Sequence, residues 1–183
     1  TYTFNVGTIN GPNPVVSGSP SICSGTWTRS GSAGAYVFTC SGNISTVSGD
    51  VLAVSNNASI TVVSSGSVDL RSTTVGSSSR NISLRTSSGT LTATGSNTIN
   101  GSVTSASGTI NLAGSSISGT VTGGGAVSLS SSSVVGNVDG DGNIILTSTT
   151  VSGAVIGDYG SINLTGGSIG GNVSSGGSIT TTS

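Results

Sequence analysis

The most regular feature of this sequence is the recurrence of single aliphatic residues separated by glycine, serine and threonine. Aligned on the pattern G-x-I/V-x-L, successive units begin at Gly108, Gly125, Gly142 and Gly160, and another begins at Gly177. The period is about 17–18 residues, and a fixed period of this kind is typical of repeat architectures, in which each unit packs on its neighbours.

Each unit carries two further aliphatic columns at fixed offsets from the first. Aliphatic residues spaced by two point to one face of a short strand, and stacked units place them in continuous rows. We therefore predict a three-sided parallel β-helix, an all-β solenoid, in which glycine provides positive φ and close coil approach at the corners. The second column is Val75, Ile99, Ile117, Val134, Val151 and Ile169, and the third is Val103, Val121, Val138, Val155 and Val173.

The earlier units are less regular. They open at Gly49, Gly66 and Gly89 and differ in length, and residues 76–86 are the expected insertion in the second of them. This alignment places Val51 in the same row as Val68. We accordingly divide the chain into an N-terminal cap or docking segment, residues 1–48, and a solenoid of about seven coils, residues 49–183.

The N-terminal segment differs in composition, since five of the six aromatic residues lie within the first 38 positions. Tyr2, Phe4 and Val6 alternate with polar residues, which predicts a strand that belongs to the cap or is offered to a neighbouring subunit. Cys23 and Cys40 flank an aromatic stretch and predict a disulfide that closes a hairpin in an oxidising compartment. The alternative is a buried reduced pair.

The C-terminal sequence "GGSITTTS" enters a new coil without charge or proline. An uncapped solenoid end presents unpaired N–H and C=O groups beside the apolar core. We predict that the coil carrying Ile179 pairs with the strand of Tyr2, Phe4 and Val6 in the next copy, which gives a head-to-tail homopolymer. The alternative is that the chain was cut from a longer surface protein.

Charge narrows the classes of function. Only 5% of the residues are charged, the net charge is -1, and there is no histidine, lysine or glutamate. Phosphate neutralisation, and with it nucleic-acid binding, is not expected, and neither is an enzyme built on a nucleophile and a base. No apolar run approaches the roughly 18 residues of a membrane span. Thr1 in place of methionine suggests a processed chain, although an artificial chain boundary would look the same. Together with the cysteine pair, this leads us to expect an extracellular or cell-surface protein after removal of a signal peptide.

One acidic cluster is a weak metal candidate. Asp139 and Asp141 lie in "NVDGDGN", and Asp158 follows Asp141 by one repeat unit, so stacked turns would bring the carboxylates together. Oxygen-rich turns suit Ca²⁺. The repeated calcium-roll motif is absent, however, which favours solvated turn residues, and no other cofactor is expected.

The units in residues 116–146 and 150–177 resemble the polymer-forming β-helix repeats of bactofilins. They are still more similar to the Ser/Thr/Gly-rich solenoid regions of secreted bacterial surface proteins associated with mannose-sensitive haemagglutinin-type pili. The resemblance covers roughly residues 42–183. It implies a right-handed, three-sided parallel β-helix and, for bactofilins, end-to-end polymerisation without nucleotide.

The leading hypothesis is a secreted structural protein that stacks head to tail into an extracellular filament. One alternative is an adhesin stalk or tip of a bacterial surface appendage, which binds a glycan or a pilus partner through a Ser/Thr face. Ice binding is a third. The most uniform candidate row for such a face is Thr74, Thr98, Ser116, Ser133, Thr150 and Ser168.

Overall fold

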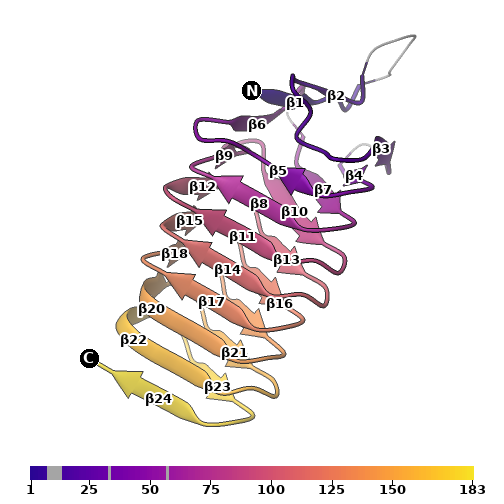
Figure 1. Ribbon diagram of the computed structural model, residues 1–183. Helices are drawn as coiled ribbons and strands as arrows, with labels where there is room; N and C mark the ends of the chain where they lie inside the picture. Colours follow the sequence, from indigo (N-terminus) through magenta and orange to yellow (C-terminus); the bar gives the residue numbers. More distant parts are fainter. Residues whose placement is uncertain (8–13, 33, 57) are drawn as a thin grey trace.

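The computed structural model describes residues 1–7, 14–32, 34–56 and 58–183. Throughout these residues the regular elements are β-strands, which wind into about seven parallel-stacked coils of a β-solenoid (Figure 1). The predicted parallel β-helix and its N-terminal disulfide are confirmed. Each regular coil gives one strand to each of three faces that run along the rod.

The three faces follow the three aliphatic columns of the sequence. The first face contains β5 (Ile44–Ser45), β8 (Val68–Arg71), β11 (Leu91–Thr94), β14 (Ile110–Ala113), β17 (Val127–Ser130), β20 (Ile144–Val151), β22 (Ile162–Ile169) and β24 (Ile179–Thr182). The second contains β6 (Val51–Val54), β9 (Thr74–Val75), β12 (Asn97–Ile99), β15 (Ser115–Ile117), β18 (Ser133–Val134) and the second halves of β20 and β22, which continue around the corner. The third contains β4 (Tyr36–Cys40), β7 (Ile60–Ser64), β10 (Ile82–Thr86), β13 (Val103–Ser105), β16 (Val121–Gly123), β19 (Val138–Gly140), β21 (Val155–Gly157) and β23 (Val173–Ser175).

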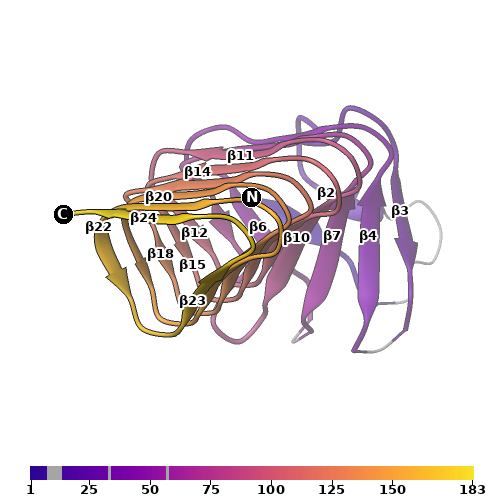
Figure 2. The same cartoon turned by 90° about the horizontal axis from the view of Figure 1, so that it is seen from below.

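The core is a set of rows of aliphatic side chains that stack coil on coil. Ile110 pairs with Val127, Val127 with Ile144 and Ile144 with Ile162, and each of these side chains is buried. The view in Figure 2 shows the coils wound around this interior. Since a single coil contributes only a few apolar side chains, the core forms only when neighbouring coils bury one another.

The register of the first coils differs from the prediction. Ile44 pairs with Val68, whereas Val51 pairs with Thr74, so Val51 lies on the second face and not in the row of Val68. The G-x-V-x-A pattern at Gly49 imitates the first-face motif. Strands β4 and β5, which precede residue 49, already stack in parallel on β7 and β8, so the first coil begins inside the segment predicted as the cap.

Coil length also decreases along the chain. On the first face Ile44 pairs with Val68 and Val68 with Leu91, whereas farther along Ile110 pairs with Val127, so fewer positions separate stacked partners in the later coils. The expected insertion at 76–86 is only partly an insertion. Its second half is strand β10, a regular third-face strand, and its first half is a turn between the second and third faces.

The N-terminal end of the solenoid is closed by a coil that winds in the opposite direction. Strand β1 (Tyr2–Phe4) lies parallel on β6, and β2 (Val16–Ser17) lies antiparallel on β1. Cys23 then forms an antiparallel bridge to Ile44 on the first face, and β3 (Trp27–Ser30) lies antiparallel on β4 on the third. Residues 16–30 therefore pass over all three faces in reverse order, and we call them the reverse coil.

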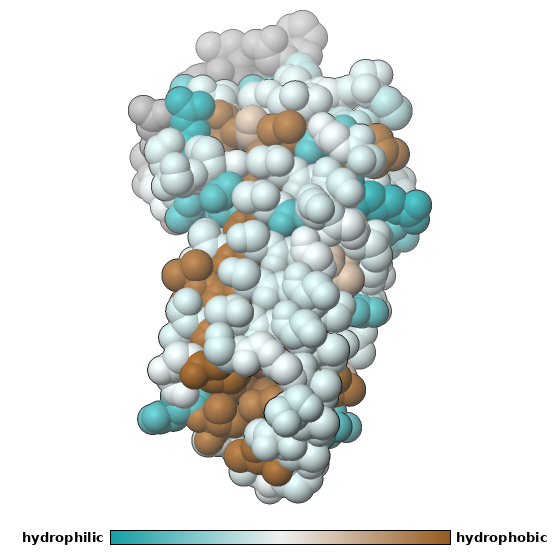
Figure 3. All heavy atoms as spheres, turned by 90° about the vertical axis from the view of Figure 1, so that its left-hand side faces the viewer, coloured by the Kyte–Doolittle hydropathy of each residue, from teal (hydrophilic) through white to brown (hydrophobic). Residues whose placement is uncertain are grey.

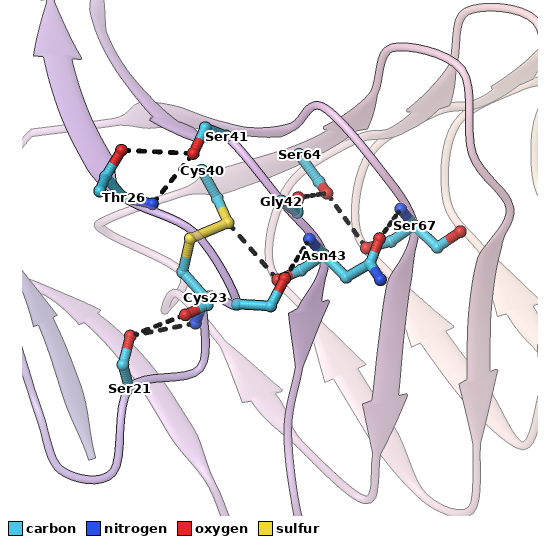
Figure 4. Close-up of a disulfide and its surroundings, with 10 residues drawn as sticks. Ser21, Cys23, Thr26, Cys40, Ser41, Gly42, Asn43, Ser64 and Ser67 are labelled. Atoms are coloured by element: carbon cyan, nitrogen blue, oxygen red, sulfur yellow. Dashed lines mark hydrogen bonds between the residues drawn. A yellow bond between two sulfur atoms is a disulfide. The ribbon is translucent and has the colours of Figure 1, made fainter.

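The reverse coil is fixed by aromatic packing and by the disulfide. Phe4 contacts Trp27 and Phe38 edge to face, with ring centroids 5.5 and 5.1 Å apart. The Cys23–Cys40 bond joins the reverse coil to the first parallel coil, close to the turn that begins at Ser41 (Figure 4). Here the Thr26 N–H donates to the Ser41 hydroxyl at 3.0 Å. The cap thus seals the apolar core with covalent, aromatic and hydrogen-bonded contacts.

Two of the predicted glycine columns reflect close approach of the coils. A Cβ on Gly108 would lie 2.2 Å from the carbonyl oxygen of Gly89, and one on Gly136 would lie 2.7 Å from that of Gly119. In those two columns Gly49 and Gly101 have positive φ, but positive φ is regular at the corner between the first and second faces, in a column that the sequence analysis did not identify. That column is Ser72, Gly95, Gly114, Ser131, Ser148 and Gly166.

The same corner contains a column of buried polar residues. Its side chains form hydrogen bonds with backbone carbonyl groups of the turn. The Ser132 hydroxyl donates to Ser130 O at 2.8 Å, and Thr149 Oγ1 donates to Thr147 O at 3.0 Å. Among the described residues, no buried side-chain nitrogen or oxygen lacks a partner. The column is Thr46, Thr73, Asn97, Ser115, Ser132 and Thr149.

Candidate functional site

Within residues 1–183, the last coil has no further coil packed on it, and the burial of the core rows decreases there. In one first-face row, Leu112 and Leu129 are fully buried and Leu146 is 1% exposed, whereas Leu164 is only partly buried. The rows of the other two faces change in the same way at Ile169 and Val173. Figure 3 shows apolar side chains gathered near the lower end of the molecule, over the last coils.

The strands of the last described coil have neighbours on one edge. In the coils before it, the Ile144 N–H donates to Ser161 O and the Ile162 N–H donates to Ser178 O, both at 2.9 Å. The next member of this row is Ile179, on β24. In the described part of the chain β24 has a strand neighbour, β22, on one edge only. Strand β23 on the third face likewise has only β21.

The end is also hollowed. A cavity of about 390 Å³ lies where β24 steps past the preceding coil. Its lining includes Leu146, Leu164, Ile169 and Thr181. No charged side chain occurs in residues 160–183, and neither does a proline. Charges and prolines are the usual protection of an exposed sheet edge, so this end retains its capacity to pair with another chain.

The four residues predicted to mediate assembly fall into two groups. Tyr2, Phe4 and Val6 are 6%, 0% and 4% exposed and belong to the cap, and both edges of β1 are already paired. Ile179 is 46% exposed and lies on the open edge. Of the two roles that the sequence left open, the N-terminal strand thus has the first, because it is part of the cap. Of the four residues, only Ile179 lies at the candidate site.

The predicted acidic cluster lies on one side of the rod. Asp139 is on β19, and Asp141 and Asp158 occupy equivalent turns of successive coils, since Gly140 pairs with Gly157. Partial burial, together with the charges of Asp158 and Asp141, raises the pKa of Asp139 above its ordinary value. In the described residues, no three or more acidic, cysteine or histidine side chains are placed to hold a metal ion.

The outer surface of the second face carries a regular row of hydroxyl groups. The residues of the predicted row, from Thr74 to Ser168, pair in register through six successive coils, and all of them are exposed. Part of the row, at Thr98, Ser116 and Ser133, lines a shallow groove of about 500 Å³ whose other lining residues are serine, asparagine and glycine. The sequence predicted the row, whereas the groove depends on the positive-φ corner and was not predicted.

Comparisons with protein-family models, with curated proteins and with solved structures found no match for this chain. The described residues contain no helix that is long and apolar enough to cross a bilayer. The geometry of the open end is accordingly the main guide to function.

Proposed function

We propose that the protein is an extracellular structural protein, a stiff rod that associates end to end with further copies through its open C-terminal end. The observation that carries the proposal is the asymmetry of the two ends. The N-terminal end is sealed by the reverse coil, whereas the C-terminal end leaves core side chains and strand edges uncovered.

The physical argument combines backbone and side-chain terms. Unpaired strand edges act as templates for further strands, and apolar area removed from water contributes about 25 cal/mol per Å². Leu164, Ile169 and Val173 supply such area beside the unpaired edges. The disulfide between Cys23 and Cys40 supports an oxidising, extracellular location.

The head-to-tail filament predicted from the sequence used the strand of Tyr2, Phe4 and Val6 as the acceptor. Since β1 already has a neighbour on each edge, that contact would require the cap to open. The proposal therefore rests on the C-terminal end, and the bacterial surface-appendage assignment remains a prediction from the resemblance.

Sedimentation velocity over a wide range of protein concentration tests the proposal. The unmodified chain is expected to form species larger than its 17.4 kDa monomer as concentration rises. Ile179→Lys should abolish this association, because it places a charge on the pairing edge. Ile145→Lys is the matched control, since Ile145 is 45% exposed and Ile179 46%, but Ile145 lies on the side of the rod. A monomer at every concentration would refute the proposal.

The hydroxyl row of the second face supports a second candidate function, binding of ice or of a glycan along the side of the rod. The supporting observation is the exposed, in-register row from Thr74 to Ser168, part of which lines the groove. Thermal hysteresis of the purified chain, compared with Thr98→Lys, distinguishes this candidate from end-to-end association. Freezing behaviour that is identical for the two chains would exclude ice binding.

A further inference from the structure

The third face carries an outward row of side chains in which two opposite charges are placed symmetrically. Its strands β7, β10, β13, β16, β19 and β21 stack in parallel and in register along the rod (Figure 1). In β10, Leu84 and Thr86 are buried and Arg85 between them is exposed, so Arg85 and the residues paired with it point outward. We call these side chains the charged row, and its members are Val63, Arg85, Thr104, Thr122, Asp139 and Ile156.

The charged row reads alike from both ends, apart from the sign of its charges. Its two central members are Thr104 and Thr122, a charged residue stands on either side of them, and an aliphatic residue lies at each end. A half-turn about a line between the two threonines exchanges threonine with threonine and valine with isoleucine. The same half-turn exchanges Arg85 with Asp139. A copy of the face turned in this way is therefore complementary in charge to the original.

Neither charge of the row is balanced within the chain. Arg85 is exposed, and its guanidinium forms no hydrogen bond or ion pair with the described residues. Asp139 lies three coils away from it, about 14 Å, which is too far for an ion pair. Partial burial and the carboxylates of Asp158 and Asp141 raise the pKa of Asp139 above its ordinary value. A cation brought to Asp139 by another molecule would therefore stabilise its charged form.

We propose that two copies pair side by side, in opposite directions, through their third faces. The two-fold axis lies between the facing sheets and runs along the strands, midway between Thr104 and Thr122. Arg85 of each copy then faces Asp139 of the other, which gives two equivalent ion pairs. Val63 and Ile156 meet in the same way and cover each other from water. The contact is lateral and goes beyond the proposed function, because it does not involve the end of the rod.

The surroundings of the charged row fit this contact. Asp141 and Asp158 occupy the same turn position in successive coils. The half-turn sets them against Ser87 and Ser65 of the partner, which occupy that position in earlier coils. The outward row on the other side, from residue 37 to residue 172, carries no charged side chain. No acidic residue of this face therefore meets another acidic residue.

Other arrangements of the same faces lose the match. A parallel pair would set Arg85 against Arg85 and Asp139 against Asp139, so like charges would face each other. Displacing the antiparallel partner by one coil would set one of the two charges against an aliphatic side chain. The other faces also lack such a match, since the outward row of the second face is uncharged and Arg71 on the first face already pairs with Asp69 at 3.0 Å.

The size of the face predicts a weak and salt-dependent dimer. Six coils are about 29 Å long and a strand of four residues is about 13 Å wide, which gives roughly 400 Å² on each copy, about half of a standard interface. Packed sheets cross at about 30°, so contacts near the axis matter most, and each charge lies only about 7 Å from the axis along the rod. Salt screens exposed charges, so the dissociation constant should rise with ionic strength.

Charge reversal tests the contact by sedimentation, in chains that also carry Ile179→Lys so that the association of the proposed function is absent. Arg85→Asp or Asp139→Arg alone sets like charges opposite each other and should raise the dissociation constant of the dimer tenfold or more. A mixture of these two variants should form a heterodimer, because every facing pair then has opposite charges. The double variant Arg85→Asp/Asp139→Arg should dimerise like the parent.

A matched control and a cross-link complete the design. Arg71→Asp changes the net charge by the same amount on the first face and should leave the dimer unchanged. Val63→Cys alone should not cross-link to itself through a short bis-maleimide, because the two cysteines would lie five coils apart, about 24 Å. Mixed with Ile156→Cys, it should give a product of two chains. Circular dichroism checks that each variant is folded.

The outcomes separate this contact from end-to-end association. Heterodimer formation by the two single variants, together with the Val63–Ile156 cross-link, supports the lateral contact. It is overturned if the mixture stays monomeric, if Val63→Cys cross-links to itself, or if the parent with Ile179→Lys is a monomer up to about 1 mM. None of these results affects end-to-end association, which is measured on the unmodified chain. Association of the unmodified chain that stops at two copies and is lost on charge reversal would support the lateral contact and contradict the end-to-end one.

Discussion

The first and last coils of this solenoid differ in whether their apolar core and strand edges are covered. At the N-terminus the parallel stack is covered by a reverse coil, a disulfide and most of the aromatic residues of the chain. At the C-terminus the aliphatic rows simply continue to the last coil and lose their burial. The difference shows that covering a coil takes residues outside the repeat, here an antiparallel strand, a disulfide and packed aromatic rings.

The largest expected effect concerns two leucines of one aliphatic row, one inside the stack of coils and one near its last coil. Leu112 and Leu164 belong to the same first-face row, with Leu112 fully buried and Leu164 half-buried at the open end. Leu112→Ala should lower the free energy of unfolding by about 2–5 kcal/mol, as for buried leucines elsewhere. Leu164→Ala should cost roughly 1 kcal/mol or less in dilute solution.

Urea denaturation of the two variants, measured at low and high protein concentration, makes the comparison. The cost of Leu164→Ala should grow with concentration, because association buries that side chain, while the cost of Leu112→Ala should stay constant. Equal costs for the two substitutions in dilute solution would mean that the C-terminal end is already covered within a single chain.

The next effect concerns the disulfide of the N-terminal cap. Cys23 and Cys40 are 17 residues apart, and a loop of this size gives a disulfide a contribution of about 3 kcal/mol. The double variant Cys23→Ala/Cys40→Ala should have a free energy of unfolding lower by about 3 kcal/mol, seen as a lower denaturant midpoint. Reducing agent should no longer shift the unfolding transition of this variant. If hydrogen exchange then rises only in residues 14–45, the cap opens as a local unit. Uniform exchange would instead show that the cap and the coils unfold together.

The smallest effect is a pH dependence near the open half of the rod. Burial and the neighbouring acids raise the pKa of Asp139 in the folded chain. The folded chain therefore binds a proton more readily than the unfolded chain, and stability at this position increases as pH falls through the raised pKa. Asp139→Asn should raise the thermal midpoint slightly at neutral pH, and this advantage should vanish in acid. An advantage that persists unchanged in acid would contradict the assignment.

The regular part of the fold could be predicted because the positions of the core residues are set within each repeat unit. Residues at offsets of two, seven and eleven from the first aliphatic residue determine which side chains face the core, and from Ile110 onward the structure follows that count. The prediction failed at Gly49, where a second-face strand imitates the first-face pattern, because nothing in five residues distinguishes one face from another.

The cap and the corners depend on contacts that a repeat count does not contain. The direction of the reverse coil follows from antiparallel pairing between positions far apart in the sequence, such as Cys23 with Ile44. The positive-φ column contains both serine and glycine in no fixed order, so it has no single-residue signature. At the candidate site, the place of Ile179 in the first-face row follows from the repeat, whereas the cavity lined by Leu146, Leu164 and Thr181 depends on how strands of several coils are arranged.

The in-register stacking of nearly equal coils also bears on how such a gene can change. Loss or duplication of a whole unit, for instance the segment from Gly125 to Gly142, rejoins similar neighbours and leaves both tips of the rod untouched. Rod length can therefore change by whole coils, in increments of about 4.8 Å, without a change in how neighbouring coils pair.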